Sequence, residues 1–235
     1  MKLVVLYCLI IAQSNLRADY NPIPNPDPTR LQDEINQYIK WDRKNSSPKN
    51  AVLFVGSSSI KMWQTSQAFP EHPVINRGFG GSHISDIIFY YDIVIKKYKP
   101  SIIIFYAGDN DIASRKSVSQ VFEDYKEITK KILKDNPIVK FIYIPIKPSI
   151  KRWMYWGNME AVNRIVKHYN KQNNNLLYID LATPIFNSKG KPDNHLFLQD
   201  KLHLNKKGYK LWESILKSIL NEIFQQNAIG KRSSR

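Results

Sequence analysis

Two hydrophobic patterns alternate along the chain. Short apolar runs rich in Val, Ile, Leu and Phe are typical of strands buried on both faces of a parallel sheet. Such runs occupy residues 51–55, 74–76, 101–106, 140–146 and 176–180. Between them, apolar residues recur at the spacing of helices that bury one face. These helical stretches are residues 29–44, 60–69, 83–98, 118–134, 158–173 and 206–225.

This alternation predicts the fold class. Strands that alternate with helices of about 10–20 residues pair in parallel, so we expect an α/β protein with helices on both faces of its sheet. Right-handed crossovers between successive strands favour a three-layer α/β/α sandwich around a flavodoxin-like, five-stranded parallel sheet.

The start of the chain has the features of an export signal. Residues 1–2 are Met and Lys, and residues 3–12 form an apolar core that is too short to span a bilayer. Ala12-Gln13-Ser14 offers a small-x-small cleavage site, and Ala18 is a second possible end. We therefore expect a signal peptide over residues 1–18 and a periplasmic or secreted protein. The alternative is an ordinary buried strand or helix at the start of the domain.

The remaining chain divides into three parts. Residues 19–50 are expected to form an arm, which alternating prolines keep extended over residues 21–28, followed by an N-terminal helix that packs on the domain. The domain itself covers residues 51–225. Residues 226–235 are polar and basic, and we expect them to form a disordered tail.

Composition limits the chemistry. The single cysteine, Cys8, lies in the predicted signal peptide, so the mature protein would hold no disulfide, thiolate zinc site or cysteine nucleophile. The five histidines show no pair at helical metal-ligand spacing, and we expect neither a metal nor a cofactor. The net charge of +15 is compatible with an anionic surface or polymer as partner. Because the lysines are spread along the chain, we favour a Lys-rich surface without a specific partner, and no specific nucleic acid is expected.

Polar residues follow the predicted strands where each strand ends. They occupy residues 57–59, 78–82, 108–111 and 147–149. The carboxyl ends of parallel strands share one edge of the sheet, where open α/β sheets hold their ligands. Asp200 and His203 lie in the last loop before the closing helix. The sequence thus brings Ser, Gly, Asn, Asp and His toward one edge, which is the composition of an acyl-transfer site.

Four segments carry a family resemblance. They are Gly56-Ser57-Ser58, Gly78-Phe79-Gly80-Gly81, Gly108-Asp109-Asn110-Asp111 and Asp200-Lys201-Leu202-His203. In this order and at these intervals they resemble the four sequence blocks of the SGNH (GDSL-type) hydrolases, over about residues 51–220. The chain looks most like the branch that contains platelet-activating-factor acetylhydrolases and related small bacterial esterases.

The resemblance implies roles for single residues. Ser58 stands at the position of the family's nucleophile, and His203 at that of the general base, with Asp200 three residues before it. Gly81 and Asn110 stand at the oxyanion-hole positions. The chain departs from the family at position 57, where Ser replaces the usual Asp, so the choice of the second serine in the run of three rests on alignment to the preceding glycine.

These residue types suit acyl transfer. A serine hydroxyl is a poor nucleophile until a neighbouring base such as His203 takes its proton. A carboxylate at Asp200 would fix the tautomer of the ring and stabilise the imidazolium. The N–H groups of Ser58 and Gly81 and the amide of Asn110 would donate to a developing oxyanion. Taken singly, each has an ordinary role, as a structural histidine, a surface carboxylate or helix cap, or a turn residue.

Other residues near these four segments are expected to support the structure of the site. We expect Asp86 to be a helix-start charge, with Ser82 as N-cap, and Asp109 and Asp111 to hold the geometry of their turn. The basic segment 147–153 either forms a substrate wall that includes Arg152 and Trp153, or is an ordinary surface loop.

The predicted activity is that of an exported serine hydrolase for short-chain acyl or acetyl esters of lipids or carbohydrates. The acyl chain length stays open. One alternative is a non-catalytic module of the same fold that holds an anionic polymer or membrane surface. A nucleotide-binding loop at residues 78–83 is disfavoured, because His83 occupies the position of the third glycine that such loops require.

Overall fold

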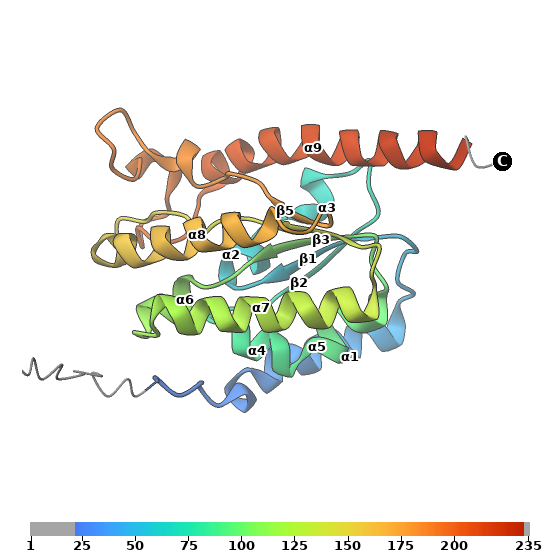
Figure 1. Cartoon of the computed structure of the whole chain (residues 1–235), viewed down its shortest axis with the longest axis horizontal. Helices are drawn as coiled ribbons and strands as arrows, with labels where there is room; N and C mark the ends of the chain where they lie inside the picture. The colour runs from blue at the N-terminus through green and yellow to red at the C-terminus, as the bar shows by residue number, and fades with distance from the viewer. Residues whose placement is uncertain (1–21, 233–235) are drawn as a thin grey trace, which may run out of the picture.

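Five parallel strands form the centre of the molecule (Figure 1). They are β1 (Val52–Gly56), β2 (Val74–Gly78), β3 (Ile102–Tyr106), β4 (Lys140–Tyr143) and β5 (Leu176–Tyr178), in the sheet order β2-β1-β3-β4-β5. The computed structural model describes residues 22–232, so the predicted signal peptide lies outside the described residues. The strand order and direction confirm the predicted flavodoxin-like α/β/α sandwich.

Helices cover both faces of the sheet (Figure 1). One face packs against α1 (Gln32–Lys44), α4 (Ile84–Phe89), α5 (Tyr91–Val94), α7 (Val118–Asp135) and α8 (Trp156–Asn170). The other face packs against α2 (Ser58–Lys61), α3 (Thr65–Ala68) and α9 (Lys206–Arg232). Short helix α6 (Asp109–Ala113) follows β3, and 3₁₀ turns occur at η1 (Pro28–Leu31), η2 (Lys96–Tyr98), η3 (Trp153–Tyr155), η4 (Thr183–Ile185) and η5 (Asn194–Leu196).

The central strands β1 and β3 are apolar along their whole length because both faces are covered. In β1, Leu53 and Val55 point into the core under α1, α4 and α7, while Val52 and Phe54 point into the core under α9, and all four side chains have no exposed surface. Full burial of such a side chain stabilises the fold by about 1.5–3 kcal/mol. This burial fixes β1 firmly, and with it the residues that follow the strand.

Two predicted helices are interrupted in the structure. Residues 60–69 form the separate short helices α2 and α3. The stretch 83–98 is divided into α4, α5 and the turn η2. The interruptions fall next to tertiary contacts: the Tyr90 hydroxyl donates to Pro28 O over 2.9 Å, and the Tyr98 hydroxyl donates to Asp42 over 2.7 Å. Apolar spacing alone does not encode these contacts.

The ends of two helices also differ from the prediction. The N-cap of α4 is His83 rather than Ser82, because Asp86 accepts a hydrogen bond from the His83 N–H over 2.7 Å. Helix α9 continues to Arg232, so the prediction of a disordered tail from residue 226 is wrong for the residues up to that point. This segment contains no proline, and a single glycine lowers helix stability by only about 1 kcal/mol.

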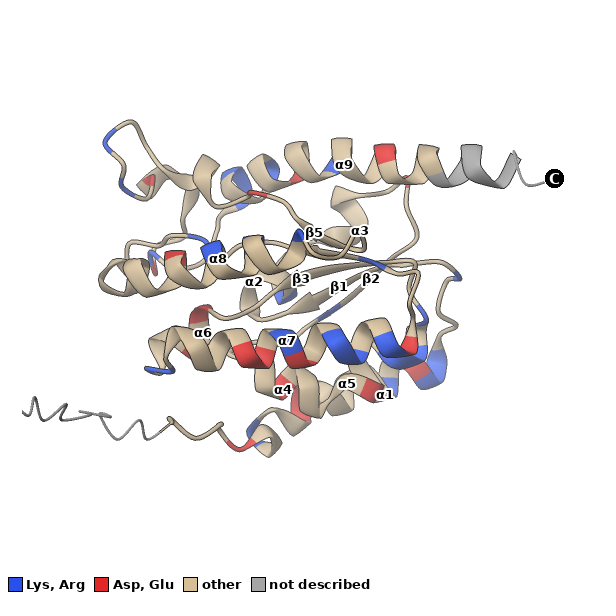
Figure 2. Cartoon of the chain, viewed as in Figure 1, with Lys and Arg blue, Asp and Glu red and all other residues tan. Residues whose placement is uncertain are grey.

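Charge is distributed over the helices rather than gathered into one block (Figure 2). Along α7, lysines alternate with acidic residues, and Lys126 pairs with Glu123 over 2.7 Å. Among the helices of residues 22–232, we find none with the length and apolar character needed to cross a membrane.

Candidate active site

The run of three serines begins where β1 ends. Gly56 has a φ of +150°, and a Cβ atom there would lie 2.0 Å from the carbonyl oxygen of Tyr106, so only glycine fits. The next N–H, that of Ser57, donates to the same oxygen over 3.0 Å. The backbone then turns into α2, whose first residue is Ser58. This tight turn places Ser58 at the carboxyl edge of the sheet, between β2 and β3.

The three hydroxyls differ in what they contact. The Ser57 hydroxyl is buried and has no hydrogen-bond partner within the described part of the chain, and the Ser59 hydroxyl is buried beside the Tyr106 hydroxyl. Ser58 is partly exposed, and its Oγ lies 2.9 Å from His203 Nε2. Ser58 is therefore the serine of this run that meets the imidazole.

A single carboxylate shapes the loop that carries His203. Asp200 Oδ1 accepts hydrogen bonds from the N–H groups of Leu202 and His203 over 2.9 and 3.0 Å. Lys201, between Asp200 and Leu202, has a φ of +56°. This is an Asx-type turn, in which an aspartate satisfies backbone donors of the next residues. Its other oxygen, Oδ2, lies 2.6 Å from His203 Nδ1.

These contacts define the proton positions. Burial is the largest single influence on the pKa of Asp200 and raises it, but hydrogen bonds from the His203 ring and from the backbone of His203 and Leu202 together outweigh burial and lower the pKa to about 2. The carboxylate is ionised and can only accept, so Nδ1 of His203 carries a proton and donates it. In the neutral ring Nε2 is then the acceptor, and the Ser58 hydroxyl donates to it.

The loops after β2 and β3 place Gly81 and Asn110 at the same edge. The Nδ2 group of Asn110 donates to Ser82 O over 3.0 Å, which ties the two loops together. Gly81 has a φ of +71°, and a Cβ atom there would meet nothing within 4 Å, so the space beside it is open. Within residues 22–232 the N–H of Gly81 has no hydrogen-bond partner, and it is available to a ligand.

Arg152 fixes the direction of the Asn110 amide. Its Nη2 donates to Asn110 Oδ1 over 2.9 Å, and its Nη1 donates to Asp109 Oδ2 over 2.8 Å. With Oδ1 taken by the guanidinium and one Nδ2 hydrogen by Ser82 O, the second Nδ2 hydrogen remains for a ligand. The segment 147–153 is therefore not an ordinary surface loop. Sequence reasoning named Arg152 only as part of a possible substrate wall, and no local spacing pairs it with Asn110.

Replacing Arg152 by methionine is expected to lower kcat for ester hydrolysis about ten-fold with little change in KM. The amide donor would remain but lose its fixed direction, so the loss is smaller than the ~10²–10³-fold cost of deleting an oxyanion donor. Steady-state kinetics on a chromogenic ester measures this. The control is Lys151→Met, because Lys151 is exposed and its side chain contacts no described residue. Equal kcat values for the two variants would contradict the assigned role.

The three aspartates with predicted supporting roles hold the surrounding loops. Asp109 pairs with Arg152, as described above. Both oxygens of Asp111 lie within 3.3 Å of the Ile84 N–H, and Lys116 Nζ lies 3.3 Å from Oδ1. Burial raises the pKa of Asp111 to about 7 despite this lysine. These contacts connect α6 to the start of α4, and so keep the Gly81 and Asn110 loops together.

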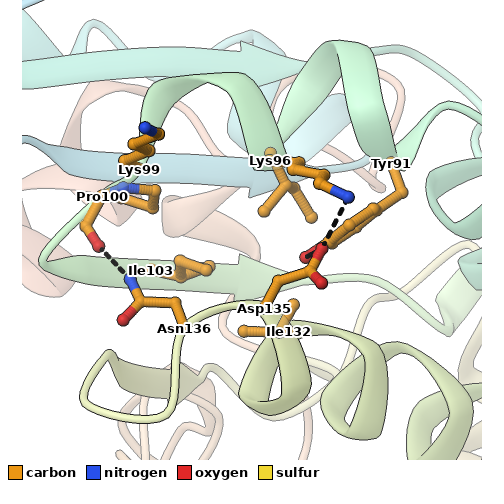
Figure 3. Close-up of a pocket in the computed structure, with 9 residues that line it drawn as sticks. Tyr91, Lys96, Lys99, Pro100, Ile103, Ile132, Asp135 and Asn136 are labelled. Carbon is orange, nitrogen blue, oxygen red and sulfur yellow. Dashed lines mark hydrogen bonds and ion pairs between the residues drawn. The ribbon is translucent and has the colours of Figure 1, made fainter.

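One cavity of the molecule lies away from this site. A cavity of about 450 Å³ opens beside Pro100 and Ile103, at the amino end of β3 and therefore away from Ser58 (Figure 3). Its polar groups satisfy each other: Lys96 pairs with Asp135 over 3.3 Å, and Asn136 donates to Pro100 O over 2.9 Å. Among residues 22–232 no group of three or more His, Cys, Asp or Glu side chains could hold a metal ion.

Comparison with known proteins identifies the family. The model of the GDSL-like lipase/acylhydrolase family matches residues 60–211, a segment that contains Gly81, Asn110, Asp200 and His203 and begins just after Ser58. The chain belongs to this family, and it is a hydrolase that acts on ester bonds. This confirms the predicted resemblance and the predicted class of enzyme. No curated protein matches the chain.

Solved structures share the fold. A Streptococcus pneumonia protein described as a platelet activating factor is 18% identical, with a TM-score of 0.73 over 81% of this chain and 93% of that one. A GDSL-like lipase from Bacteroides thetaiotaomicron is 17% identical, with a TM-score of 0.71 over 80% of this chain and 98% of the lipase. A carbohydrate esterase family 3 protein from Talaromyces cellulolyticus is 16% identical, with a TM-score of 0.61 over 76% and 99% of the two chains.

Proposed function

We propose that the chain cleaves carboxylic esters through an acyl-enzyme on Ser58, with His203 as general base and Asp200 as the group that orients the imidazole. The observation that carries the proposal is the continuous hydrogen-bonded line from Asp200 Oδ2 through the His203 ring to Ser58 Oγ, with separations of 2.6 and 2.9 Å. A nucleophile held by a base that is itself held by a third group is the arrangement that activates a hydroxyl.

The reaction proceeds in two halves. Ser58 Oγ attacks the ester carbonyl carbon while its proton moves to His203 Nε2. The resulting oxyanion accepts hydrogen bonds from the N–H groups of Ser58 and Gly81 and from Asn110 Nδ2. The imidazolium then gives its proton to the leaving alcohol, and the acyl group stays on Ser58. In the second half the imidazole takes a proton from water, and the hydroxide attacks the acyl carbon. The bond from that carbon to Ser58 Oγ then breaks, the carboxylic acid leaves, and Ser58 Oγ takes the proton back from the imidazolium.

The substrates we propose are short-chain acyl or acetyl esters of lipids or carbohydrates. The site is open: the side chains of His203 and Asp200 are 21% and 38% exposed. An open site suits small acyl groups better than long chains, which bind in deep apolar pockets. The fold is shared both with a protein described as a platelet activating factor and with a carbohydrate esterase. We therefore include esters of lipids and esters of carbohydrates among the proposed substrates.

Export by the N-terminal apolar segment belongs to the same proposal. It rests on the basic start and on the apolar residues 3–12. The net charge of +15 supports a role for an anionic surface or polymer near the site of action. Expression of the full chain with N-terminal sequencing of the released protein tests export, and retention of residues 1–18 would contradict it.

Replacing Asp200 by asparagine is expected to lower kcat about 10²-fold, less than for a fully buried aspartate of a triad. Water screens a carboxylate that is 38% exposed, so its charge contributes less to stabilising the imidazolium. Because the folded-state pKa is about 2, below the ordinary value of 3.8, the stabilising contribution of the charge is complete above the ordinary value and is lost only as the pH falls through about 2. Asp200 therefore stays ionised from pH 5 to pH 8, and kinetics of wild type and variant in this range measure the effect of the substitution.

Two measurements test the function. The purified protein is assayed on p-nitrophenyl acetate, butyrate and octanoate, and is then labelled with a fluorophosphonate and mapped by mass spectrometry. We expect hydrolysis that falls with chain length and a single adduct on Ser58. An adduct on another residue would overturn the site. No hydrolysis and no adduct, together with salt-sensitive binding to a polyanion such as heparin, would instead favour a non-catalytic binding module.

A further inference from the structure

Helix α1 contacts the loop that carries Gly81, although it lies outside the segment matched by the family model. Glu34 on this helix accepts a hydrogen bond at Oε2 from the N–H of Gly80 over 3.2 Å. The same oxygen lies 2.8 Å from Nζ of Lys61. Lys61 is the last residue of α2, the short helix that begins with Ser58. The Glu34 carboxylate therefore contacts both the loop that carries Gly81 and the short helix that begins with Ser58.

Further contacts from the N-terminal segment hold the two ends of this loop. The Tyr38 hydroxyl donates to the carbonyl oxygen of Gly78, where β2 ends. Beyond the loop, Asp86 accepts from the N–H of His83 over 2.7 Å, and Arg30 donates to both oxygens of Asp86 over 2.8 and 2.6 Å. The N-terminal segment of η1 and α1 thus fixes the loop on both sides of Gly81.

The loop is anchored on both sides of its two central glycines, since the Phe79 N–H donates to Gly56 O over 2.9 Å and Ser82 O accepts from Asn110 Nδ2 over 3.0 Å. Gly80 and Gly81 have no side chains, and a Cβ atom on Gly81 would meet no heavy atom within 4 Å. The nearest atoms to a Cβ placed on Gly80 are Oε1 of Glu34 at 3.5 Å and the Lys61 side chain at 3.7 Å. Glu34 binds the N–H of Gly80, and the next peptide along the chain carries the N–H of Gly81. The contact with Glu34 therefore influences the direction of the Gly81 N–H.

We propose that Glu34 is a positioning residue, which sets the Gly81 N–H relative to Ser58 by binding Gly80 and Lys61 at once. This rests on the proposed function, in which Gly81 donates to the oxyanion. Glu34 acts through Gly80 and touches no reacting atom. The ion pair is exposed, with side chains 26% and 48% accessible, and such pairs add little to stability. Removing the Glu34 side chain therefore tests its effect on the position of the Gly81 N–H more than its effect on folding.

The test compares variants of two neighbouring acidic residues in the first turn of α1. Glu34→Ala is expected to lower kcat on p-nitrophenyl acetate about ten-fold, with KM within about two-fold, since small misplacement of a donor slows the chemical step. The control is Asp33→Ala, which removes the same charge from the same turn, because Asp33 is exposed and its side chain forms no hydrogen bond or ion pair with a described residue. Glu34→Gln keeps an oxygen that can accept from Gly80, and most of the kcat should be restored.

A second readout is independent of activity. Hydrogen–deuterium exchange of the Gly80 amide, whose N–H donates to Glu34, is expected to be faster in Glu34→Ala than in Asp33→Ala, with unchanged exchange in α7. If Glu34→Ala matches the control in both kcat and exchange, the positioning role is wrong. If the wild type hydrolyses no ester, the proposed function fails, and the exchange measurement still decides whether Glu34 holds the loop.

Discussion

Replacing Ser58 by alanine is expected to abolish ester hydrolysis, with a loss in kcat of about 10⁵- to 10⁶-fold and no change in fold. The hydroxyl donates to His203 Nε2 over 2.9 Å, and no other serine of the run reaches this ring. Without it no acyl-enzyme forms, and only the oxyanion donors and binding remain to accelerate attack by water. Initial rates on p-nitrophenyl acetate with the pure variant measure the loss.

The matched control for this variant is Ser57→Ala. The Ser57 hydroxyl is fully buried and has no partner within the described residues, so its loss breaks no hydrogen bond. We expect Ser57→Ala to keep activity within a few-fold of wild type and to keep fluorophosphonate labelling, while Ser58→Ala loses both. Labelling that persists in Ser58→Ala would show that the nucleophile is a different residue.

Replacing His203 by alanine is expected to lower kcat about 10⁴- to 10⁶-fold. The variant keeps the serine but removes the acceptor for its proton, so Ser58 remains a weak nucleophile. The residual rate should rise steadily with pH, because hydroxide then replaces the missing base. A pH–rate profile from pH 6 to pH 10 distinguishes this from simple misfolding.

The control here is His195→Ala, in the same closing loop. His195 is exposed and its ring contacts no described residue, whereas its carbonyl oxygen, which accepts from Asn205 over 2.9 Å, is retained by alanine. Thermal unfolding should be similar for both variants, since the His203 side chain is only partly buried. A His203→Ala variant with near wild-type kcat would remove the imidazole from the mechanism.

The sheet was predictable from the sequence because strands buried on both faces must be apolar throughout. The runs around Leu53 and Ile103 carry that signal directly, and each lies in a strand of the structure. The positions of Ser58, Gly81 and Asn110 at one edge then follow from parallel pairing, because the carboxyl ends of neighbouring strands lie together.

Contacts between distant side chains were not predictable in the same way. Arg152 reaches Asn110 across 42 residues of sequence, and Glu34 reaches Gly80 across 46. Such pairs depend on how a loop or an N-terminal helix packs on the domain. Neither the hydrophobic periodicity nor the four family-like segments of the sequence predict that packing. The interruption of the helix at Tyr90 has the same origin, since its hydroxyl binds the backbone of Pro28.

Ser58 and His203 are separated by 145 residues, and the last helix, which follows His203, packs beside the serine run. In α9 the Tyr209 hydroxyl donates to Ser59 O over 2.9 Å, and the indole of Trp212 donates to Leu181 O over 2.8 Å. On the proposed mechanism, a chain still emerging from the ribosome therefore has a serine whose base has not yet been made. Ester cleavage then begins only after His203 and the helix that follows it have been synthesised and folded.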